Sequence, residues 1–447
     1  MILRQIKSLL SFSQNNSSLR RHLTKSAIGS FVLKVSATAL LFLTTLILAR
    51  ILGAKGYGAY AYAISLIGLF NILVLFGLPM LATREISVYN THSKWEILKG
   101  FLRWSERFVF TNSLVVALIA FIITWILRQY FNHQMLLPFW MALFLLPVLS
   151  LLQLKEASIQ GLKRILTGQI SSTIIRPVLL LLTVGFLYLF KYSITPSIAV
   201  GINAIVTLIA LLVAFFILVQ SLPKPVKFAI LEYKVSIWIK SAFPLLLSGA
   251  LTLLNTQTDI IMLGAIKGAK AAGIYAVATR IATLIIFVLI SVNSAIAPTI
   301  AELYSKKDLK RLKNIITKSA RLTFFFSLPI AIFLIFWGRF PLWLFGKEFM
   351  GGSIALAILS IGQLISASTG SVGLILIMTG CEREFTLGAG ISAVANIVLN
   401  ATLIPFLDMN GAALATSTSM IIWSMISIIM IYKRLGIDPT ILGIYNE

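Results

Sequence analysis

The sequence predicts an all-α polytopic membrane protein with twelve transmembrane helices in two six-helix lobes related by a parallel repeat. Three observations support this prediction: 58% hydrophobic residues with a mean hydropathy of +0.96, twelve long apolar runs, and a motif that recurs 215 residues later. Only 12% of the 447 residues are charged, about half the fraction usual in soluble domains. The chain therefore has no room for a sizeable soluble domain beside its spans.

The first segment, residues 1–27, is polar and basic, and its apolar residues are spaced as in a weakly amphipathic helix. We expect it to lie on the membrane surface. A cleaved signal peptide is the alternative, but the apolar run that follows extends to about Leu48 and contains Lys34, with no small-x-small cleavage pattern. That run is therefore predicted to be the first span.

Twelve apolar runs are bounded by charged residues, glycine or proline, and each has the length of a membrane helix, which needs about 20 residues. The N-lobe, residues 28–220, contains the runs 28–50, 57–81, 108–127, 138–156, 169–190 and 196–220. The C-lobe, residues 241–432, contains the runs 241–265, 272–297, 320–340, 352–379, 387–407 and 410–432. An inner linker, 221–240, joins the lobes, and a cytoplasmic tail, 433–447, follows them.

The basic residues are unevenly distributed over the connections between spans. With the N-terminus inside, the inner segments carry 27 of the 38 Lys and Arg residues and the outer segments carry 8. Because cytoplasmic loops retain positive charge, we expect a multi-pass protein of the cytoplasmic membrane with both termini in the cytoplasm. The net charge of +24 then reflects its loops, and we expect no nucleic-acid partner.

Few residues offer redox or metal chemistry. The only cysteine, Cys381, cannot form an intramolecular disulfide, and the three histidines are too scattered to suggest a metal site. No nucleotide-binding loop of the Gly-x-x-x-x-Gly-Lys-Ser/Thr type occurs. We therefore expect no cofactor and no resident metal, apart from a coupling Na⁺ or H⁺.

An internal repeat follows the first helix of each predicted lobe. Residues 53–61 read Gly-Ala-Lys-Gly-Tyr-Gly-Ala-Tyr-Ala, and residues 268–276 read Gly-Ala-Lys-Ala-Ala-Gly-Ile-Tyr-Ala. Because six is even, both halves enter the membrane in the same sense, which gives a parallel repeat. Two such bundles favour a central cavity and alternating access by rocking. We expect the motif glycines to allow tight backbone turns at the outer surface.

The same segments resemble a known family. Residues 48–53, Leu-Ala-Arg-Ile-Leu-Gly, with Tyr-Gly-Ala-Tyr at 57–60, resemble a signature of the polysaccharide transporter (oligosaccharide flippase) family of the MOP/MATE superfamily. Residues 258–264, Thr-Asp-Ile-Ile-Met-Leu-Gly, with Gly-Ile-Tyr at 273–275, resemble the family's seventh-to-eighth helix segment. The likeness covers nearly the whole chain in length, topology and repeat.

The resemblance implies a MOP-type flippase fold and a flippase that works by alternating access. Its cargo would be a polyprenyl-pyrophosphate-linked oligosaccharide, moved from the inner to the outer leaflet for surface polysaccharide biosynthesis. The implied partners are this lipid-linked oligosaccharide, membrane lipids and other polysaccharide-assembly proteins. Twelve spans fit this branch better than the lipid II flippases, which carry two additional helices.

Four charged residues lie well inside the predicted spans, away from their ends, where each costs about 2.5 to 3.5 kcal/mol on insertion scales. Lys34 and Arg176 lie roughly 10 Å from the inner side, so they either snorkel to the interface or line a cavity that receives lipid pyrophosphate. Arg280 and Asp259 lie at similar depth in adjacent antiparallel helices. Either they form an ion pair, or Arg280 contacts phosphate and Asp259 is an ion-coupling or proton site. An arginine near the start of the eighth helix is also a feature of lipid II flippases, so the resemblance favours Arg280 as a substrate contact.

Amide side chains in the spans are candidates for sugar recognition. Asn255 and Gln257 are predicted substrate-binding residues, and Asn293 and Asn71 offer the same hydrogen-bonding groups. The alternative for each amide is a hydrogen bond that joins two helices.

Two other functions stay open: an ion-coupled multidrug exporter of the same superfamily and a membrane polysaccharide polymerase. A polymerase needs catalytic acids or bases on an extramembrane loop, whereas the outer loops here are short and nearly free of acids, so we expect no enzyme. A multidrug exporter is expected to use acidic intramembrane residues for organic cations. This chain offers Asp259 as the one clear acid within a span, and Glu156 lies near an inner end.

Overall fold

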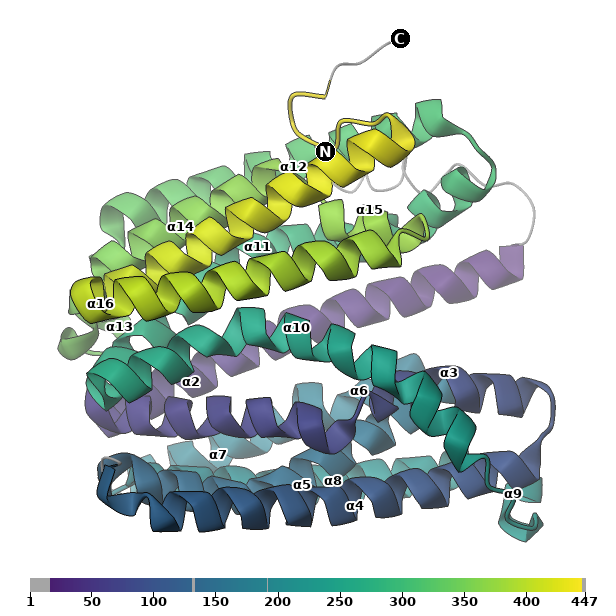
Figure 1. Ribbon diagram of the computed structural model, residues 1–447, viewed down its shortest axis with the longest axis horizontal. Coiled ribbons are helices and arrows are strands. Elements are labelled where there is room, and N and C mark those ends of the chain that lie inside the picture. The colour runs from purple at the N-terminus through teal and green to yellow at the C-terminus, as the bar shows by residue number, and fades with distance from the viewer. Residues whose placement is uncertain (1–16, 131–132, 191, 444–447) are drawn as a thin grey trace.

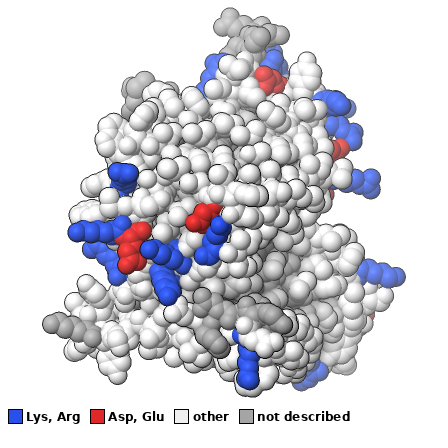
Figure 2. Space-filling view, turned by 60° about the vertical axis from the view of Figure 1, so that its left-hand side comes forward, with Lys and Arg blue, Asp and Glu red and all other residues white. Residues whose placement is uncertain are grey.

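The computed structural model describes residues 17–130, 133–190 and 192–443, and the regular structure in these ranges is helical. Large apolar side chains face outward along the helices, with Phe144 73% and Leu189 78% exposed. Figure 2 shows charged side chains gathered in small groups, with uncharged surface between them. Apolar surface on this scale is unusual for a soluble protein and is what a multi-pass membrane protein presents to lipid.

The helices follow one another with short connections. The first half of the described chain contains α2 (Ser17–Leu75), α3 (Leu78–Thr91), α4 (Trp95–Ile126), η1 (Arg128–Tyr130), α5 (His133–Gly161), α6 (Ile165–Ile170), the π-helix η2 (Ser171–Ile175), α7 (Arg176–Leu189) and α8 (Pro196–Ser221). The second half contains α9 (Lys224–Phe228), α10 (Val235–Lys267), α11 (Ala269–Ser305), α12 (Leu309–Trp337), α13 (Arg339–Phe345), η3 (Lys347–Gly352), α14 (Ser353–Ser368), α15 (Val372–Met378) and α16 (Glu382–Leu435).

The predicted number of spans is recovered once two long helices are divided. Among the described residues, nine helices are long and apolar enough to cross a membrane, and the bent helix α10 makes ten. Helices α2 and α16 have 59 and 54 residues, about 80 to 90 Å of straight helix against a hydrocarbon core of about 30 Å. Each instead folds back on itself, at Gly53 (φ 65°) and at Asp408 (φ 53°) (Figure 1). Each therefore supplies two spans, which gives the predicted twelve.

Two predicted continuous spans are broken in the structure, and a third contains a π-helical turn. The run 57–81 is interrupted at Gly77 (φ 74°) between α2 and α3, and the run 352–379 is interrupted at Gly370 (φ 72°) between α14 and α15. The run 169–190 passes through the π-helix η2. Glycine adopts a left-handed backbone without a steric penalty, and the flanking residues stay apolar, so hydropathy gives no sign of these breaks.

The ends of the chain differ from the predicted segments in detail. Residues 1–16 of the predicted surface segment lie outside the described residues, and residues 17–27 continue directly into the first span. At the other end, residues 436–443 fold back onto the C-lobe. The Arg321 guanidinium donates to the carbonyl oxygens of Ile441 at 3.1 Å and Gly443 at 3.2 Å.

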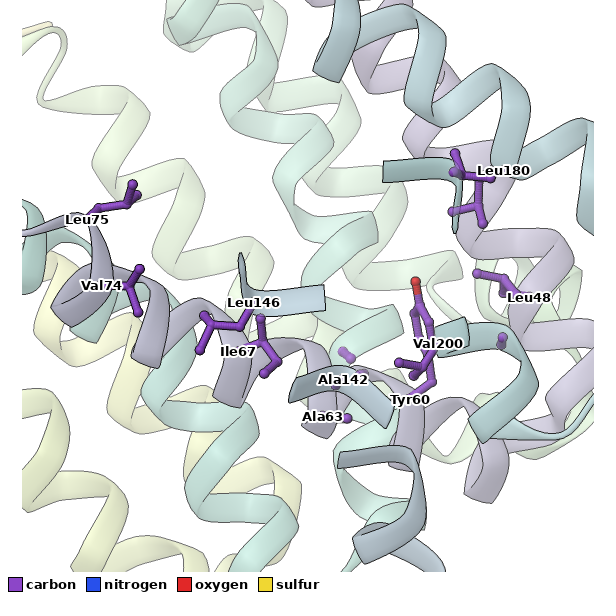
Figure 3. Close-up of a cluster of buried hydrophobic side chains, with 14 of the residues drawn as sticks. Leu48, Tyr60, Ala63, Ile67, Val74, Leu75, Ala142, Leu146, Leu180 and Val200 are labelled. Carbon is purple, nitrogen blue, oxygen red and sulfur yellow. The ribbon is translucent and has the colours of Figure 1, made fainter. Parts of the chain in front are cut away.

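Helices α2 to α8 form one layer of the molecule and α11 to α16 form the other, and α10 runs between them (Figure 1). In the first layer, which we call the N-lobe, α5 packs on α2, α4 and α8, and in the second, the C-lobe, α14 packs on α11, α12 and α16. Figure 3 shows the N-lobe core around Tyr60, with Leu48, Ala63, Ile67, Ala142, Leu146, Leu180 and Val200. Such packing of small and branched side chains holds helices together in lipid, where hydrophobic burial contributes little.

The two copies of the repeat motif pack against each other. A Cβ atom on Gly58 would lie 1.6 Å from the Ala269 carbonyl oxygen, and a Cβ atom on Gly273 would lie 2.1 Å from the Ala54 carbonyl oxygen. Residues 58 and 273, and residues 54 and 269, are equivalent at the offset of 215, so the contact is two-fold symmetric. We call this contact between α2 and α11 the seam.

The motif glycines therefore have two structural roles. The first glycine of each copy, Gly53 or Gly268, has a positive φ, 65° or 87°, which confirms the predicted backbone turn. The second role, close helix approach at Gly58 and Gly273, was not predicted.

Candidate functional site

The C-lobe contains a buried carboxylate held by neutral side chains. Asp259, on α10, is only 4% exposed. Its Oδ1 atom accepts hydrogen bonds from the amides of Asn396 at 3.1 Å and Asn400 at 2.6 Å. Its Oδ2 atom accepts hydrogen bonds from the hydroxyls of Tyr275 at 3.1 Å and Thr416 at 2.5 Å. We call these five residues the carboxylate centre.

Local helix geometry explains how the carboxylate centre assembles. Asn396 and Asn400 are four residues apart in the first half of α16, so both amides lie on one helix face. Thr416 comes from the second half of α16, which folds back at Asp408, and Tyr275 comes from the repeat motif in α11. The sequence prediction identified Asp259 but missed these four partners. The spacing of the two asparagines within an apolar run was the available signal.

The predicted alternative of an ion pair between Asp259 and Arg280 is wrong. No lysine or arginine lies within ion-pair distance of Asp259 in the described part of the chain, and its oxygens are taken by the four neutral donors. Tyr275, one of these donors, lies five residues before Arg280 on the same helix. The two side chains therefore project from different faces of α11.

The carboxylate centre contains the types of oxygen atom that coordinate cations. Carboxylate, amide and hydroxyl oxygens are the ligands preferred by hard cations. The Oδ1 atom of Asn400 is buried and has no hydrogen-bond partner, although buried acceptors are usually paired. This free acceptor, beside the Asp259 carboxylate, fits a small cation or a proton on the carboxylate.

The N-lobe contains a second polar centre, which we call the arginine centre. Arg176, the first residue of α7, is half-buried and donates through Nε at 3.3 Å and Nη2 at 3.0 Å to the Oδ1 atom of Asn203 on α8. The amide of Asn203 donates in turn to the hydroxyl of Tyr60, at 2.8 Å. Arg176 therefore points into the N-lobe, toward α8 and α2. These contacts do not fit the predicted alternative in which Arg176 snorkels to the interface.

Arg280 lies on α11 of the C-lobe, close to the seam. Its guanidinium is within electrostatic range of the hydroxyls of Tyr57 and Tyr60 across the lobe boundary. It is half-buried and has no hydrogen bond or ion pair to any side chain in the described ranges. An unpaired charge at membrane depth is costly, so an anionic ligand that paired with Arg280 would offset this cost. The Tyr60 hydroxyl is thus within electrostatic range of both Arg176 and Arg280.

The remaining predicted binding residues fall into three groups. The Lys34 side chain lies outside the described residues. Asn255 donates to the carbonyl oxygens of Leu251 at 3.0 Å and Ala389 at 3.2 Å. It therefore joins α10 to α16, which is the alternative that we gave to sugar recognition. Gln257 is half-buried, and within the described ranges its side chain makes no hydrogen bond.

The other two amides also join helices. The Asn71 amide donates to Oε1 of Gln153 at 3.0 Å, and Asn293 accepts a hydrogen bond from the Ser371 hydroxyl. Two surface pockets lie beside Arg434 and beside Trp125, and neither touches the arginine or the carboxylate centre. The chamber predicted between the lobes stays a prediction.

Comparison with known families identifies the family to which this chain belongs. The profile of the family described as "Polysaccharide biosynthesis protein" matches residues 23–304, more than half of the chain, and that of the family described as "MatE" matches residues 244–406. The chain belongs to the polysaccharide biosynthesis protein family. The resemblance seen in the sequence is therefore confirmed.

Two curated relatives match part of this chain. The "Probable flippase AglR" of Haloferax volcanii is 26% identical over 193 residues, which are 42% of this chain and 40% of the relative. The "Capsular polysaccharide biosynthesis protein CapF" of Staphylococcus aureus is 28% identical over 196 residues, 43% of this chain and 48% of the relative. The chain thus spans less than half the length of each of these relatives.

Several solved structures resemble this protein over nearly its whole length. An inward-facing MATE multidrug transporter of the MOP superfamily superimposes with a TM-score of 0.72 at 12% identity, over 89% of this chain and 94% of the other. The lipid II flippase MurJ in an inward closed conformation gives 0.71 at 16% identity, over 90% and 87%. These likenesses show the fold, and the predicted MOP-type fold is confirmed.

Proposed function

We propose that this protein is an alternating-access flippase that moves a polyprenyl-pyrophosphate-linked oligosaccharide from the inner to the outer leaflet of the cytoplasmic membrane. The observation that carries the proposal is Arg280, a half-buried arginine close to the seam whose guanidinium has no hydrogen bond or ion pair to any described side chain. A guanidinium offers a planar fork of donors that matches phosphate oxygens. The family, the relatives named as a flippase and a capsular polysaccharide protein, and the fold all support this cargo.

The direction of transport follows from the orientation that we propose. The basic connections predicted to be cytoplasmic include the linker around α9, and both termini are placed on that side. The seam closes the opposite end, where Glu348 of the C-lobe accepts a hydrogen bond from the Ala54 backbone N–H at 2.9 Å and the Nε atom of Arg50 donates to the Leu344 carbonyl oxygen at 2.6 Å. The space between the lobes would then be open to the cytoplasmic leaflet, where the lipid-linked cargo is made by other polysaccharide-assembly proteins.

Replacing Arg280 tests the proposed cargo. We expect Arg280→Ala to abolish complementation of a strain that lacks its own oligosaccharide flippase, and Arg280→Lys to restore it in part, because lysine keeps the charge but loses the fork. Arg311→Ala is the matched control, because Arg311 is 70% exposed in a surface ion pair. Membrane abundance of each variant is measured alongside. Normal glycan export by Arg280→Ala would remove Arg280 from the binding site.

We further propose that the carboxylate centre is the coupling site for Na⁺ or H⁺. Its buried carboxylate and the unpartnered Asn400 oxygen support this role. Asp259→Asn is expected to abolish the dependence of transport on a Na⁺ or pH gradient in proteoliposomes. Glu302→Gln is the control, because Glu302 pairs with Lys306 on the surface. An unchanged ion dependence in Asp259→Asn would leave Asp259 with a structural role alone.

A multidrug exporter is the second candidate, since the MatE profile and the MATE structures share this fold. Such a protein needs an acid that an organic cation can reach. Here Asp259 is enclosed within the C-lobe by neutral donors, and the positive charge of Arg280, close to the seam, would repel a cationic drug. Arg280 therefore favours an anionic cargo over a cationic one. The family match and the fold support a transporter over a polysaccharide polymerase or other enzyme.

A further inference from the structure

The internal repeat gives the two polar centres equivalent tyrosines. Tyr60 and Tyr275 stand at the same place in the two copies of the motif, 215 residues apart. Both are buried, at 9% and 1% exposure. Each phenol bonds to a residue of the last helix of its own lobe: Tyr60 to Asn203 in α8, and Tyr275 to Thr416 in the second half of α16, at 2.9 Å. The arginine centre and the carboxylate centre are therefore structural counterparts.

The counterparts carry opposite charges. In the C-lobe the charge is that of Asp259 in the lobe's first helix, whereas the equivalent N-lobe position is Thr44, which is neutral and bonds to its own helix backbone. In the N-lobe the charge is that of Arg176 in the fifth helix, whereas the fifth helix of the C-lobe supplies the neutral Asn396 and Asn400. The carboxylate centre thus contains a buried acid and the arginine centre a half-buried cation.

The guanidinium of Arg176 has donors to spare. It carries five N–H groups, and Asn203 is its one hydrogen-bond partner in the described ranges, through Nε and Nη2. Three N–H groups are left without an acceptor there. A neutral amide does not balance a charge at this depth, so no described residue acts as a counter-ion in direct contact with Arg176.

The nearest acid does not fill this role. Glu156 is within electrostatic range of Arg176, but the two are not within ion-pair distance, and Oε1 of Glu156 accepts the backbone N–H of Ser172 at 2.8 Å. Ser172 belongs to the π-helix η2, which leads directly into Arg176. Pro177, the next residue, has no N–H for the regular helix pattern, and π-helical turns frequently mark functional sites. Glu156 thus stabilises the turn that positions Arg176.

We propose that the arginine centre is a binding site for a phosphate-type oxyanion, the N-lobe counterpart of the carboxylate centre. The lobes then bind ligands of opposite charge, an anion in the N-lobe and a cation in the C-lobe. The oxyanion comes either from the pyrophosphate of the lipid-linked cargo, in which case the site rests on the proposed function, or from a free inorganic anion. Arg280 of the C-lobe is also within electrostatic range of Tyr60, so an anion at this site also approaches the C-lobe.

The test is anion-dependent thermal stability of the purified full-length protein in detergent, titrated with inorganic pyrophosphate and, separately, with polyprenyl pyrophosphate. We expect Arg176→Gln to weaken the apparent affinity at least about tenfold, because it removes a charge-assisted fork. Glu156→Gln keeps an acceptor for Ser172 but removes a negative charge, so we expect it to strengthen the affinity several-fold. Arg128→Gln, on the exposed η1 turn, is the control and should match the wild type.

The two probes separate the sources of the anion. Arg176-dependent stabilisation by polyprenyl pyrophosphate alone identifies the cargo headgroup, and stabilisation by both probes identifies a general oxyanion site. Equal responses of the wild type and Arg176→Gln to both probes, or no response of the wild type, would overturn the proposal. If Arg176→Gln does not yield folded protein, Glu156→Gln decides, and an unchanged affinity overturns the proposal. Because binding is measured without transport, Arg176-dependent binding in a protein that moves no lipid would refute the flippase and leave the anion site intact.

Discussion

Replacing Gly58 with alanine is expected to hold the seam open. The added Cβ would lie 1.6 Å from the Ala269 carbonyl oxygen, so the two lobes must separate locally by about 2 Å to restore an ordinary contact. Overpacking of this kind costs about 1 to 3 kcal/mol, and the penalty falls on the closed seam alone. The ratio of closed to open protein should then fall roughly 5- to 150-fold.

Cysteine labelling measures this shift. Cys381→Ser removes the single native cysteine, and Ala59→Cys then places a thiol in the seam, where Ala59 is 3% exposed and packs with Ala269. A membrane-impermeant maleimide applied outside intact cells should label this thiol slowly in the parent and faster when Gly58→Ala is added. The label must reach the seam from the outside, so the experiment also tests the proposed orientation.

Gly201→Ala is the matched control for Gly58→Ala. Gly201 also lies in a membrane helix, but a Cβ there would meet no atom within 4 Å, so alanine should be neutral or slightly stabilising. Faster labelling in both variants would point to a general loosening of the helices. An unchanged rate in Gly58→Ala would refute the reasoning that the motif glycines set the distance between the lobes.

Two further substitutions probe one contact of the seam and one contact that anchors α10 in the N-lobe. Glu348→Gln keeps an acceptor for the Ala54 N–H but loses the charge, which should destabilise the closed seam by about 1 kcal/mol. The rate of seam labelling should therefore rise, but by less than in Gly58→Ala. A labelling rate equal to that of the parent would contradict this. Tyr89 accepts the indole N–H of the fully buried Trp238 at 3.0 Å, so Tyr89→Phe should lower the thermal stability in detergent by the cost of an unpaired buried donor, about 1 to 3 kcal/mol. Tyr304→Phe, at the equivalent position of the repeat and 36% exposed, should have no effect, and equal losses in both tyrosine variants would refute the argument.

The sequence predicted most of the fold because lipid imposes a simple rule. Every span must be long, apolar and helical, so hydropathy and the repeat were sufficient for twelve spans and two lobes. The breaks at Gly77 and Gly370 escaped prediction, because apolar residues continue on both sides and a single glycine in a membrane helix is common.

The candidate site was predicted only in part. The cost of a charge in lipid pointed to Asp259, Arg176 and Arg280 without any structure. Sequence gives the depth of a side chain along a helix but not the neighbour that it meets, so Asp259 and Arg280 were open to interpretation as an ion pair. The neutral partners of Asp259 were missed for a related reason: Asn400 and Thr416 belong to a class of residue that often joins helices without binding a ligand.

Helix α10 belongs to both lobes at once. Its first part, Val235–Leu251, packs the Trp238 ring against those of Phe101 and Trp104 in the N-lobe, and its second part, bent by 48°, presents Asp259 to the C-lobe. If a cation binds at the coupling site that we propose beside Asp259, it would act on a helix whose other end is anchored in the N-lobe. Ion occupancy and the tilt of the two lobes would then be linked through the backbone of α10 itself, without passing through the seam.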